Sequence, residues 1–334
     1  MNKKSQTKKV LITGITGFVG SHLAELALDR GVKVYGLKRW HLSKLRNIRH
    51  LLYKIELIDC DLTDPVGVNK VITLTKPDWI YHLAAESFVS PSWDHPSHYM
   101  DVNFKGTVNL LEALRHNSPD THILLPGSGE EYGEVDKSDI PITDKTALQP
   151  VNPYAVSKIA QDLIGFVYFK SYGLPVIRTR AFNHEGPRRD NVFGIASYAY
   201  QIARIEAGKQ PPVVVTGERS DRRNFTHIKD LVAAYWLALE KCRPGKLYLI
   251  GSDEKDHIFT FDQALDQLIA MSTYKKPIKK VINKKYVRPT SVPRLISDTS
   301  EFRKLTGWKP TIPFKQILED TLDYWREFVN NGWY

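Results

Sequence analysis

Thr13-Gly14-Ile15-Thr16-Gly17-Phe18-Val19-Gly20 is the stretch of sequence that decides the fold of this chain. It follows the short apolar run 10–12 and opens the segment 18–30, in which apolar residues recur at helical spacing. Its glycines give G-x-x-G-x-x-G, a variant of the fingerprint at the first strand–helix turn of dinucleotide-binding folds. The first glycine permits a tight turn, the second a close approach to a pyrophosphate, and the third close packing of helix on strand. The candidate cofactor-binding residues here are Gly14, Thr16, Gly17, Phe18, Val19 and Gly20.

Strands and helices alternate through the first half of the chain. The apolar runs predict strands at 10–12, 32–37, 55–58, 79–83, 122–125 and 176–179. Helical spacing predicts helices at 18–30, 64–75, 97–116 and 153–171. This alternation indicates an α/β fold, a doubly wound parallel sheet of the Rossmann type.

After Arg180 the pattern loosens, and a second, smaller lobe is expected. Helices are predicted at 194–207, 231–239, 261–271 and 314–329, with a strand at 247–250. We expect a dinucleotide-binding domain over 1–180, with a return segment at about 224–251. Residues 181–223 and 252–334 are expected to form a C-terminal substrate-binding lobe.

The residues after the second strand indicate which dinucleotide is bound. An NAD enzyme carries Asp or Glu there, which holds the ribose 2′-hydroxyl. This chain has Lys38-Arg39, and an arginine fork can bind a 2′-phosphate that a carboxylate would repel. NADP is therefore expected, with Arg39 as the 2′-phosphate ligand. Further cofactor contacts are expected at the carboxyl ends of the third and fourth strands, from Asp61, Leu62, Leu83, Ala84 and Ala85. Tyr154 and Lys158 are also expected to contact the cofactor.

Composition limits the classes of function. The 334 residues are 42% hydrophobic and 25% charged, which is typical of a soluble globular protein. The net charge of +10 comes partly from lysines in 3–9 and 275–285, but no nucleic-acid-binding module accompanies it, and a basic protein also suits an anionic substrate. No run approaches the roughly 20 apolar residues of a membrane helix, and the polar start does not resemble a signal peptide. Cys60 and Cys242 have no metal-ligand spacing and are expected to be reduced thiols in a cytoplasm.

A catalytic group is expected at the start of the helix over 153–171. In Asn152-Pro153-Tyr154-Ala155-Val156-Ser157-Lys158, Asn152 suits the N-cap and Pro153 the first helical position. Tyr154 and Lys158 are four residues apart and share one helix face. The ammonium stabilises a phenolate, so Tyr154 can exchange a proton with a sugar hydroxyl. Ser128, after the fifth strand, is placed to hydrogen-bond the same substrate oxygen.

Together, the glycine loop, Ser128, Tyr154 and Lys158 resemble the extended short-chain dehydrogenase/reductase superfamily over essentially the whole chain. Three segments resemble GDP-mannose 4,6-dehydratases in particular. They are Asn183-His184-Glu185-Gly186-Pro187-Arg188-Arg189, Arg222-Arg223-Asn224-Phe225 with His227 and Lys229-Asp230, and Arg288-Pro289-Thr290-Ser291-Val292 with Gly307-Trp308-Lys309-Pro310.

This resemblance implies an internal redox cycle on a GDP-sugar. Hydride passes from C4 of the hexose to NADP, a carboxylate removes the C5 proton, water leaves from C6, and the hydride returns to C6. Glu130 in Ser128-Gly129-Glu130-Glu131-Tyr132-Gly133 matches the acid/base position of the dehydratases, with Glu131 as the alternative. Gly129 departs from their Ser or Asp and resembles the GDP-4-keto-6-deoxymannose reductases. An NADPH-dependent reductase is therefore an alternative, and a 4-epimerase and an inactive NADP-binding scaffold are two others.

The resemblance also implies the substrate ligands. Arg223 and Arg288 are expected to bind the diphosphate, and Ser87 and Asn183 other parts of the GDP-sugar, whose hexose is mannose or a heptose analogue. His184 and His227 are expected to be structural, and no metal is expected. A homodimer or homotetramer is expected, with neither nucleic acid nor membrane as partner.

Overall fold

The computed structural model describes residues 7–253, 255–290 and 292–332. It therefore leaves out residues 1–6 of the basic N-terminal tail and Ser291 of the segment after Arg288. The chain forms two compact units. One contains the chain up to Ser128 with Pro153–Arg180 and Val232–Tyr248, and the other contains Gly129–Asn152, Ala181–Leu231 and the chain from Leu249 onward.

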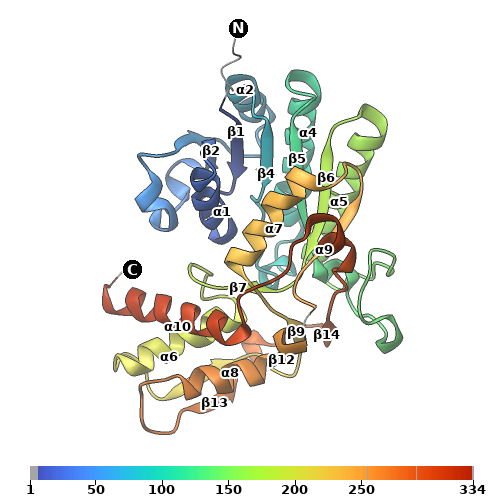
Figure 1. Cartoon of the computed structure of the whole chain (residues 1–334). Helices are drawn as coiled ribbons and strands as arrows, with labels where there is room; N and C mark the ends of the chain where they lie inside the picture. Colours follow the sequence, from blue (N-terminus) through green and yellow to red (C-terminus); the bar gives the residue numbers. More distant parts are fainter. Residues whose placement is uncertain (1–6, 254, 291, 333–334) are drawn as a thin grey trace. The chain divides into compact units, whose positions relative to one another are not determined.

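The first unit is built on a seven-stranded sheet in the order β11-β6-β5-β4-β1-β2-β3 (Figure 1). Its strands are β1 (Lys9–Thr13), β2 (Lys33–Lys38), β3 (Glu56–Asp59), β4 (Trp79–His82), β5 (His122–Ser128), β6 (Val176–Ala181) and β11 (Leu247–Ile250). Strand β1 pairs in parallel with both β2 and β4, and the order reverses direction there. That reversal is the place where Rossmann-type sheets bind dinucleotides, so the predicted fold class is confirmed.

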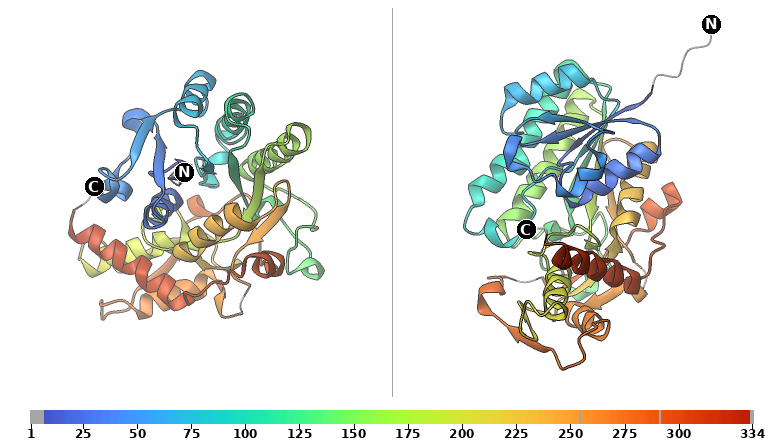
Figure 2. Two further views of the ribbon diagram at one scale, coloured as in Figure 1. Left: turned by 45° about the horizontal axis from the view of Figure 1, so that its top comes forward. Right: turned by 90° about the vertical axis from the view of Figure 1, so that its left-hand side faces the viewer.

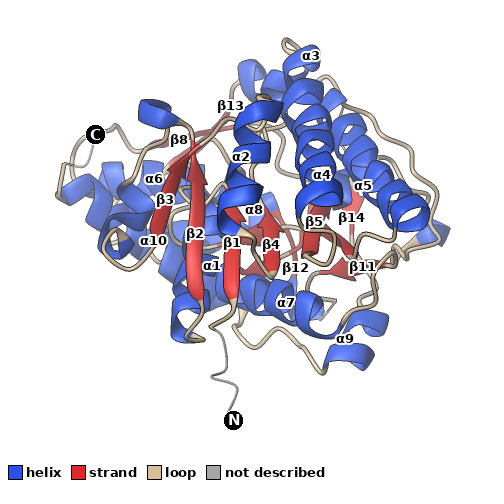
Figure 3. Ribbon diagram, turned by 90° about the horizontal axis from the view of Figure 1, so that it is seen from above, coloured by secondary structure: helices blue, strands red, loops and turns tan. Residues whose placement is uncertain are grey.

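Helices cover both faces of this sheet. In Figure 3, α2 (Pro65–Thr75), α4 (Gly106–Asn117) and α5 (Pro153–Tyr172) lie on one side of the strands, and α1 (Phe18–Asp29) and α7 (Ile228–Lys241) on the other. Residues of β1 such as Leu11 are fully buried, because a strand covered on both faces contacts no water. The sheet and its helices thus form the doubly wound layers that the sequence predicts.

The predicted helix over 97–116 is interrupted. It begins as α3 (Pro96–Tyr99), passes through a π-helical segment, Met100–Lys105, and continues as α4. Such a segment inserts an extra residue into the helical turn and is frequent at functional sites. It carries the buried Asn103.

The second unit has a helical core of α6 (Gly194–Glu206), α8 (Phe261–Ala270) and α10 (Phe314–Asn330). Figure 2 shows α10, in red, running beside α6, in yellow. The strands beside this core are short. They are β8 (Val213–Thr216) with β13 (Lys279–Ile282), β9 (Arg222–Asn224) with β12 (Ile258–Thr260) and β14 (Arg294–Leu295), and β7 (His184–Glu185) with β10 (Thr226–His227). Helix α9 (Ser300–Thr306) precedes the segment that leads into α10.

The unit boundaries differ from the expected domain limits of 1–180 and about 224–251. Residues 129–152 group with the second unit, and the return segment is Val232–Tyr248. The reason is a separate apolar cluster that ties the 129–152 segment to the second unit. It consists of Tyr132, Ile142, Phe182, Leu249, Val292 and Leu295.

Candidate active site

The glycine loop has the backbone geometry that only glycines allow. Gly14 has φ of +67°, and a Cβ there would lie 2.8 Å from the Ala84 amide nitrogen. A Cβ on Gly20 would lie 2.3 Å from the Gly14 carbonyl oxygen. Each contact is too short for a side chain, so the loop leaves open backbone at the start of α1, the end of a helix that favours anions. The loop therefore fits a dinucleotide pyrophosphate.

A buried hydrogen-bond chain holds the end of β4 against this loop. The Ala84 amide donates to Thr13 Oγ1 at 3.0 Å, and Thr13 Oγ1 lies 3.0 Å from His82 Nδ1. On the other side of the ring, His82 Nε2 lies 2.9 Å from Thr107 Oγ1, whose hydroxyl donates to the Asn103 carbonyl. Because the Thr107 proton is used in that bond, His82 Nε2 must donate and Nδ1 must accept from Thr13. Burial, with the nearby Lys158 charge, lowers the pKa of His82 to about 3, in agreement with this neutral form.

The π-helical segment connects that hydrogen-bond chain to helix α5. Asn103 Nδ2 donates to Ser157 Oγ at 2.9 Å and to the Glu86 carbonyl at 3.0 Å, while Asn103 Oδ1 accepts from the Glu86 amide at 2.8 Å. Ser157 Oγ in turn donates to the Tyr154 carbonyl at 2.7 Å. One buried side chain therefore fixes both the loop after β4 and the first turn of α5.

Tyr154 and Lys158 lie on that first part of α5 and are both buried. The Tyr154 ring contacts the Tyr99 ring edge-on, with centroids 6.3 Å apart. Lys158 Nζ donates to Gln161 Oε1. Ser128 is the last residue of β5 in the same unit, so all three residues come from the unit that carries the glycine loop.

The two basic residues after β2 have different surroundings. Lys38 Nζ is paired with Asp59 of β3, whereas the Arg39 side chain is 45% exposed. Arg39 Nη2 lies 4.0 Å from Glu86 Oε1, a distance that allows only a weak interaction in water. Arg39 is therefore the basic group able to turn toward a 2′-phosphate.

The other predicted cofactor residues follow β3 and β4. Asp61 Oδ1 accepts bonds from the Thr63 amide at 2.9 Å and from Thr63 Oγ1 at 2.8 Å, which shapes the turn after β3. Leu62 is buried beneath Asn109, which donates to its carbonyl at 2.8 Å. Leu83, Ala84 and Ala85 form the partly buried loop after β4, and Ser87, expected to bind substrate, is exposed just beyond it.

Arg39→Ala is expected to weaken NADP binding at least tenfold and to change NAD binding little. The reason is that only NADP has the 2′-phosphate that loses its charged partner. Titration of both cofactors by intrinsic fluorescence would measure the two dissociation constants. An equal loss for both cofactors would show that Arg39 does not serve the 2′-phosphate.

In the second unit, Glu130 lies in the 3₁₀ turn Gly129–Tyr132 and is 15% exposed. Asn152 Nδ2 donates to Glu130 Oε2 at 3.1 Å, and Arg288 Nη1 lies 3.5 Å from Glu130 Oε1. Asn152, expected only to cap α5, thus holds the carboxylate that the sequence singles out. Glu131, the neighbouring acid in this turn, is fully buried, whereas Glu130 is partly exposed.

Arg223 is buried in the same unit, with 3% of its side chain exposed. Its Nη1 donates to the Arg222 carbonyl at 3.0 Å, and its Nη2 lies 3.4 Å from Asp221 Oδ2. Burial lowers the pKa of Arg223, and the Glu130 and Asp221 charges oppose that effect. The structure therefore places Arg223 and Arg288 in one electrostatic cluster with Glu130. Asp221 also belongs to this cluster, and the sequence alone did not indicate it.

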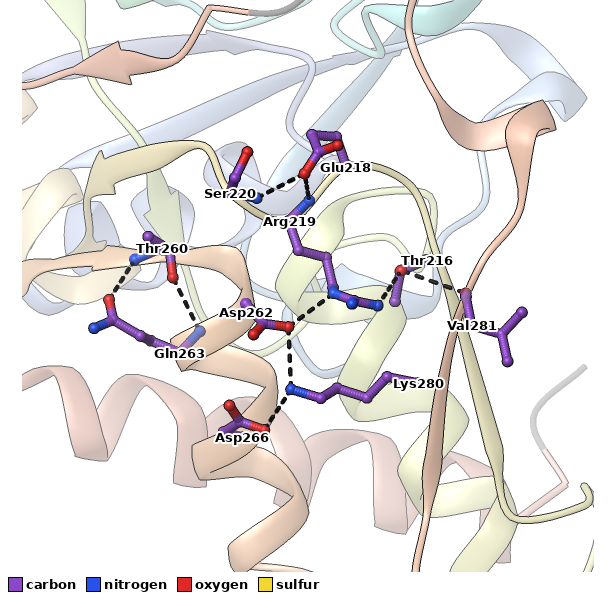
Figure 4. A network of polar contacts seen from close by, with 10 residues as sticks. All are labelled: Thr216, Glu218, Arg219, Ser220, Thr260, Asp262, Gln263, Asp266, Lys280 and Val281. Atoms are coloured by element: carbon purple, nitrogen blue, oxygen red, sulfur yellow. Dashed lines mark hydrogen bonds and ion pairs between the residues drawn. The ribbon is translucent and has the colours of Figure 1, made fainter.

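The loop 217–221, which leads into β9, the strand of Arg223, is braced on one side by α8 and β13 (Figure 4). Arg219 Nη1 donates to Thr216 Oγ1 at 3.0 Å, and Arg219 Nε lies 2.8 Å from Asp262 Oδ1. Lys280 Nζ bonds the same Asp262 oxygen at 3.1 Å and Asp266 at 2.6 Å. This network fixes the start of the segment that leads to Arg223.

Asn183 is not part of that cluster in the described structure. Its carbonyl accepts a bond from the Thr226 amide at 3.0 Å, and its side chain is half-buried. The next residues form β7, where burial lowers the pKa of His184 to about 3 and raises that of Glu185 from 4.5 to about 7. Arg189 Nε lies 4.0 Å from Glu185 Oε2, and its positive charge offsets the rise in the Glu185 pKa only in part. Sequence reasoning had no signal for this buried acid, because its burial depends on tertiary packing.

Glu185→Gln is expected to stabilise the protein at high pH only. Because the folded-state pKa of Glu185 is raised, its contribution to stability is present below pH 4.5 and is lost as the pH rises through about 7. Gln stays neutral, so the variant should gain on the order of 3 kcal/mol at pH 9 and less than about 1 kcal/mol at pH 5. Urea unfolding at both pH values would measure the difference, with Glu240→Gln, an exposed site, as control. A gain that does not depend on pH would contradict the assignment.

The chain combines a Rossmann-type sheet and a glycine loop with a serine at the end of β5 and a tyrosine and a lysine at the start of α5. These features define an extended short-chain dehydrogenase/reductase. Within that class, the chain belongs to the GDP-mannose 4,6 dehydratase family, whose sequence model matches residues 11–321.

Known proteins agree with this membership. The chain is 31% identical over 331 residues to GDP-mannose 4,6 dehydratase 1 of Arabidopsis thaliana, covering 95% of this chain and 89% of the relative. It is similar to the structure of RMD from Pseudomonas aeruginosa complexed with NADPH, with a TM-score of 0.82, 28% identity, and 96% and 99% of the two chains covered. It is equally similar to UDP-glucose 4-epimerase from Thermus thermophilus in complex with NAD, with a TM-score of 0.83, 28% identity, and coverage of 95% and 99%. The fold is thus shared by enzymes with different names, and the sequence family is the more specific finding.

Proposed function

We propose that this protein is a GDP-mannose 4,6-dehydratase, which converts GDP-mannose, or a close GDP-sugar, to the GDP-4-keto-6-deoxy sugar and water. The observation that carries the proposal is Glu130, a partly buried carboxylate bonded by Asn152 and paired with Arg288. It follows Ser128 by two residues, so an acid/base group comes directly after the residue expected to hold the C4 oxygen. Oxidation or reduction at C4 needs no such carboxylate, whereas elimination does.

Two residues, Tyr154 and Glu130, are proposed to carry out the proton transfers of this reaction. Tyr154 accepts the proton of the C4 hydroxyl, with the Lys158 ammonium stabilising the phenolate and Ser128 orienting the oxygen. The C4 ketone then makes the C5 proton acidic, and Glu130 removes it. Glu130 passes this proton to the C6 hydroxyl, which leaves as water. At the end of the cycle Tyr154 releases the proton taken from the C4 hydroxyl, and one proton returns to C5 through Glu130 after exchange with solvent. NADP, when bound, supplies the hydride chemistry between C4 and C6.

The residues that hold this cofactor are proposed to be those of the β1–α1 loop, Asp61, Leu62, the loop 83–85, and Arg39 at the 2′-phosphate. The cradle of Gly14, Gly17 and Gly20 supports the pyrophosphate position, since a Cβ on any of them would meet backbone within 3.1 Å. Arg223 and Arg288 are proposed to bind the substrate diphosphate, with Ser87 and Asn183 at other parts of the GDP-sugar.

Product analysis tests the proposed reaction. Purified protein with catalytic NADP should convert GDP-mannose to a product lighter by one water, seen by mass spectrometry. A 4-epimerase would return an isomer of unchanged mass. If GDP-mannose is untouched and the 4-keto-6-deoxy sugar consumes NADPH stoichiometrically, the protein is the reductase.

We further propose a homodimer or homotetramer, located in the cytoplasm. The support for a cytoplasmic location is that Cys60 and Cys242 are both free and buried. In the described part of the chain, no helix combines the length and apolarity needed to cross a membrane. The support for an oligomer is an exposed apolar stripe on α5, formed by Val156, Leu163, Phe166 and Val167.

Leu163→Glu is expected to break this oligomer. The stripe on α5 would be covered by the same stripe of a second copy, and a buried unpaired carboxylate would oppose that contact. Light scattering coupled to size-exclusion chromatography would measure the mass. Leu74→Glu, at an exposed leucine of α2, is the matched control and should leave the mass unchanged. A Leu163→Glu protein of wild-type mass would place the interface elsewhere.

A further inference from the structure

The Glu130 carboxylate is held by two groups of different character. Asn152, which is buried, donates to Oε2 at 3.1 Å, and Arg288, which is 35% exposed, lies 3.5 Å from Oε1. Among the described residues, Glu130 is the one carboxylate within ion-pair distance of Arg288. The general base of the proposed reaction is therefore paired with a proposed ligand of the diphosphate.

The two arginines of the cluster differ in how firmly they are fixed. Arg223 is buried, bonds the Arg222 carbonyl and pairs with Asp221. Arg288 follows the 3₁₀ turn Lys284–Tyr286 in a loop, and a third of its long side chain contacts water. A partly exposed side chain on a loop can change rotamer at small cost, whereas a buried guanidinium cannot. Arg288 is thus the member of the pair that can exchange partners.

The charges of the four groups named above sum to zero without a nucleotide. Two guanidinium groups, on Arg223 and Arg288, face two carboxylates, on Glu130 and Asp221. A diphosphate adds two further negative charges, and it offers a guanidinium a better bidentate acceptor than one carboxylate oxygen at 3.5 Å. Phosphate and carboxylate therefore compete for Arg288.

We infer that Arg288 is a switch: it holds Glu130 in the nucleotide-free protein and transfers to the diphosphate when the GDP-sugar binds. After the transfer, Glu130 stays bonded to Asn152. Its Oε1 then contacts the sugar instead of Arg288. Arg288 would act on the proton step through Glu130, as a positioning residue, in addition to binding substrate. This inference rests on the proposed function, since it requires that the diphosphate reach this cluster.

The test is a double-mutant cycle on the affinity for GDP, which needs no catalysis. Isothermal titration of NADP-saturated wild type, Glu130→Gln, Arg288→Ala and the double variant gives four dissociation constants. Glu130→Gln should bind GDP about threefold to tenfold more tightly, because Arg288 no longer has to leave an ion pair. Arg288→Ala should bind about tenfold more weakly, and adding Glu130→Gln to it should change the affinity no further.

Other outcomes would overturn the inference. If Glu130→Gln raises GDP affinity equally in wild type and in Arg288→Ala, the cause is general repulsion between carboxylate and diphosphate. If it raises GDP affinity in neither, the ion pair does not compete with the diphosphate. Glu134→Gln, an exposed glutamate of the same loop, should have no effect and is the matched control. Arg288→Lys, which keeps the charge, guards against a folding defect of the alanine variant and should retain part of the coupling. If wild-type protein does not bind GDP, the proposed function itself fails, an outcome that differs from binding without coupling.

Discussion

Tyr154→Phe is expected to lower the rate of sugar conversion by a factor of about 10³ or more while NADP affinity stays within about twofold. The change removes the one oxygen that exchanges a proton with the C4 hydroxyl, and it leaves the ring in its contact with Tyr99. Lys158 and Ser128 remain, but neither replaces an acid/base group bonded to the reacting oxygen. Single-turnover assays and cofactor titration would measure the two quantities separately.

Tyr168→Phe is the matched control for this prediction. Tyr168 lies on the same helix, and its hydroxyl donates a bond to Glu112 that the Phe variant lacks. The variant therefore also removes a tyrosine hydroxyl from α5, but away from its first turn. It should keep wild-type turnover. Turnover retained by Tyr154→Phe would show that another group handles the C4 proton.

The sequence predicts the parts of the fold that depend on local pattern. The glycine spacing predicts the first strand–helix turn, and the alternation of strands and helices predicts the parallel sheet covered on both faces. The predicted end of β5, at residue 125, is too early, because Pro126 and Gly127 are typical strand breakers. Pro126 and Gly127 are tolerated in β5 because the pairing of β5 with β4 ends at Leu124, before either residue.

Features that depend on distant packing could not be predicted. Nothing in residues 97–116 signals the π-helical segment, whose Asn103 gains its role from bonds to Glu86 and Ser157 in other elements. Asn152 has the sequence context of a helix cap, and its bond to Glu130 forms only when residues 22 apart in sequence meet. Residues of chemical interest were thus predictable by type and spacing, whereas their supporting residues were not.

Gly129 is the position at which the sequence resembles reductases instead of dehydratases, and packing gives it a separate explanation. A Cβ at Gly129 would lie 3.1 Å from the Phe182 ring, which stacks on Tyr132 in the same apolar cluster. The ring would have to shift by a few tenths of an ångström to admit a side chain. Gly129 therefore fits Phe182, and its identity says little about the reaction.

Glu130→Gln is expected to separate oxidation at C4 from the loss of water. The amide keeps the size of the side chain and can still bond to Asn152, but it cannot accept the C5 proton. Oxidation needs Tyr154, Lys158 and Ser128, so reduced-nicotinamide absorbance should still appear when GDP-mannose is added to NADP-loaded protein. Formation of the 4-keto-6-deoxy sugar should fall by a factor of about 10³, and solvent deuterium should no longer enter C5.

Glu131→Gln is the matched control for this step, because it changes the neighbouring acid in the same 3₁₀ turn. Glu131 is fully buried, so its variant is expected to lose stability rather than the ability to eliminate water. If Glu130→Gln eliminates water at the wild-type rate while Glu131→Gln folds but does not, Glu131 is the base. If both variants eliminate at the wild-type rate, the acid/base group lies outside this turn. Loss of C4 oxidation in Glu130→Gln would instead assign Glu130 to the redox step, because elimination cannot begin before the C4 ketone has formed.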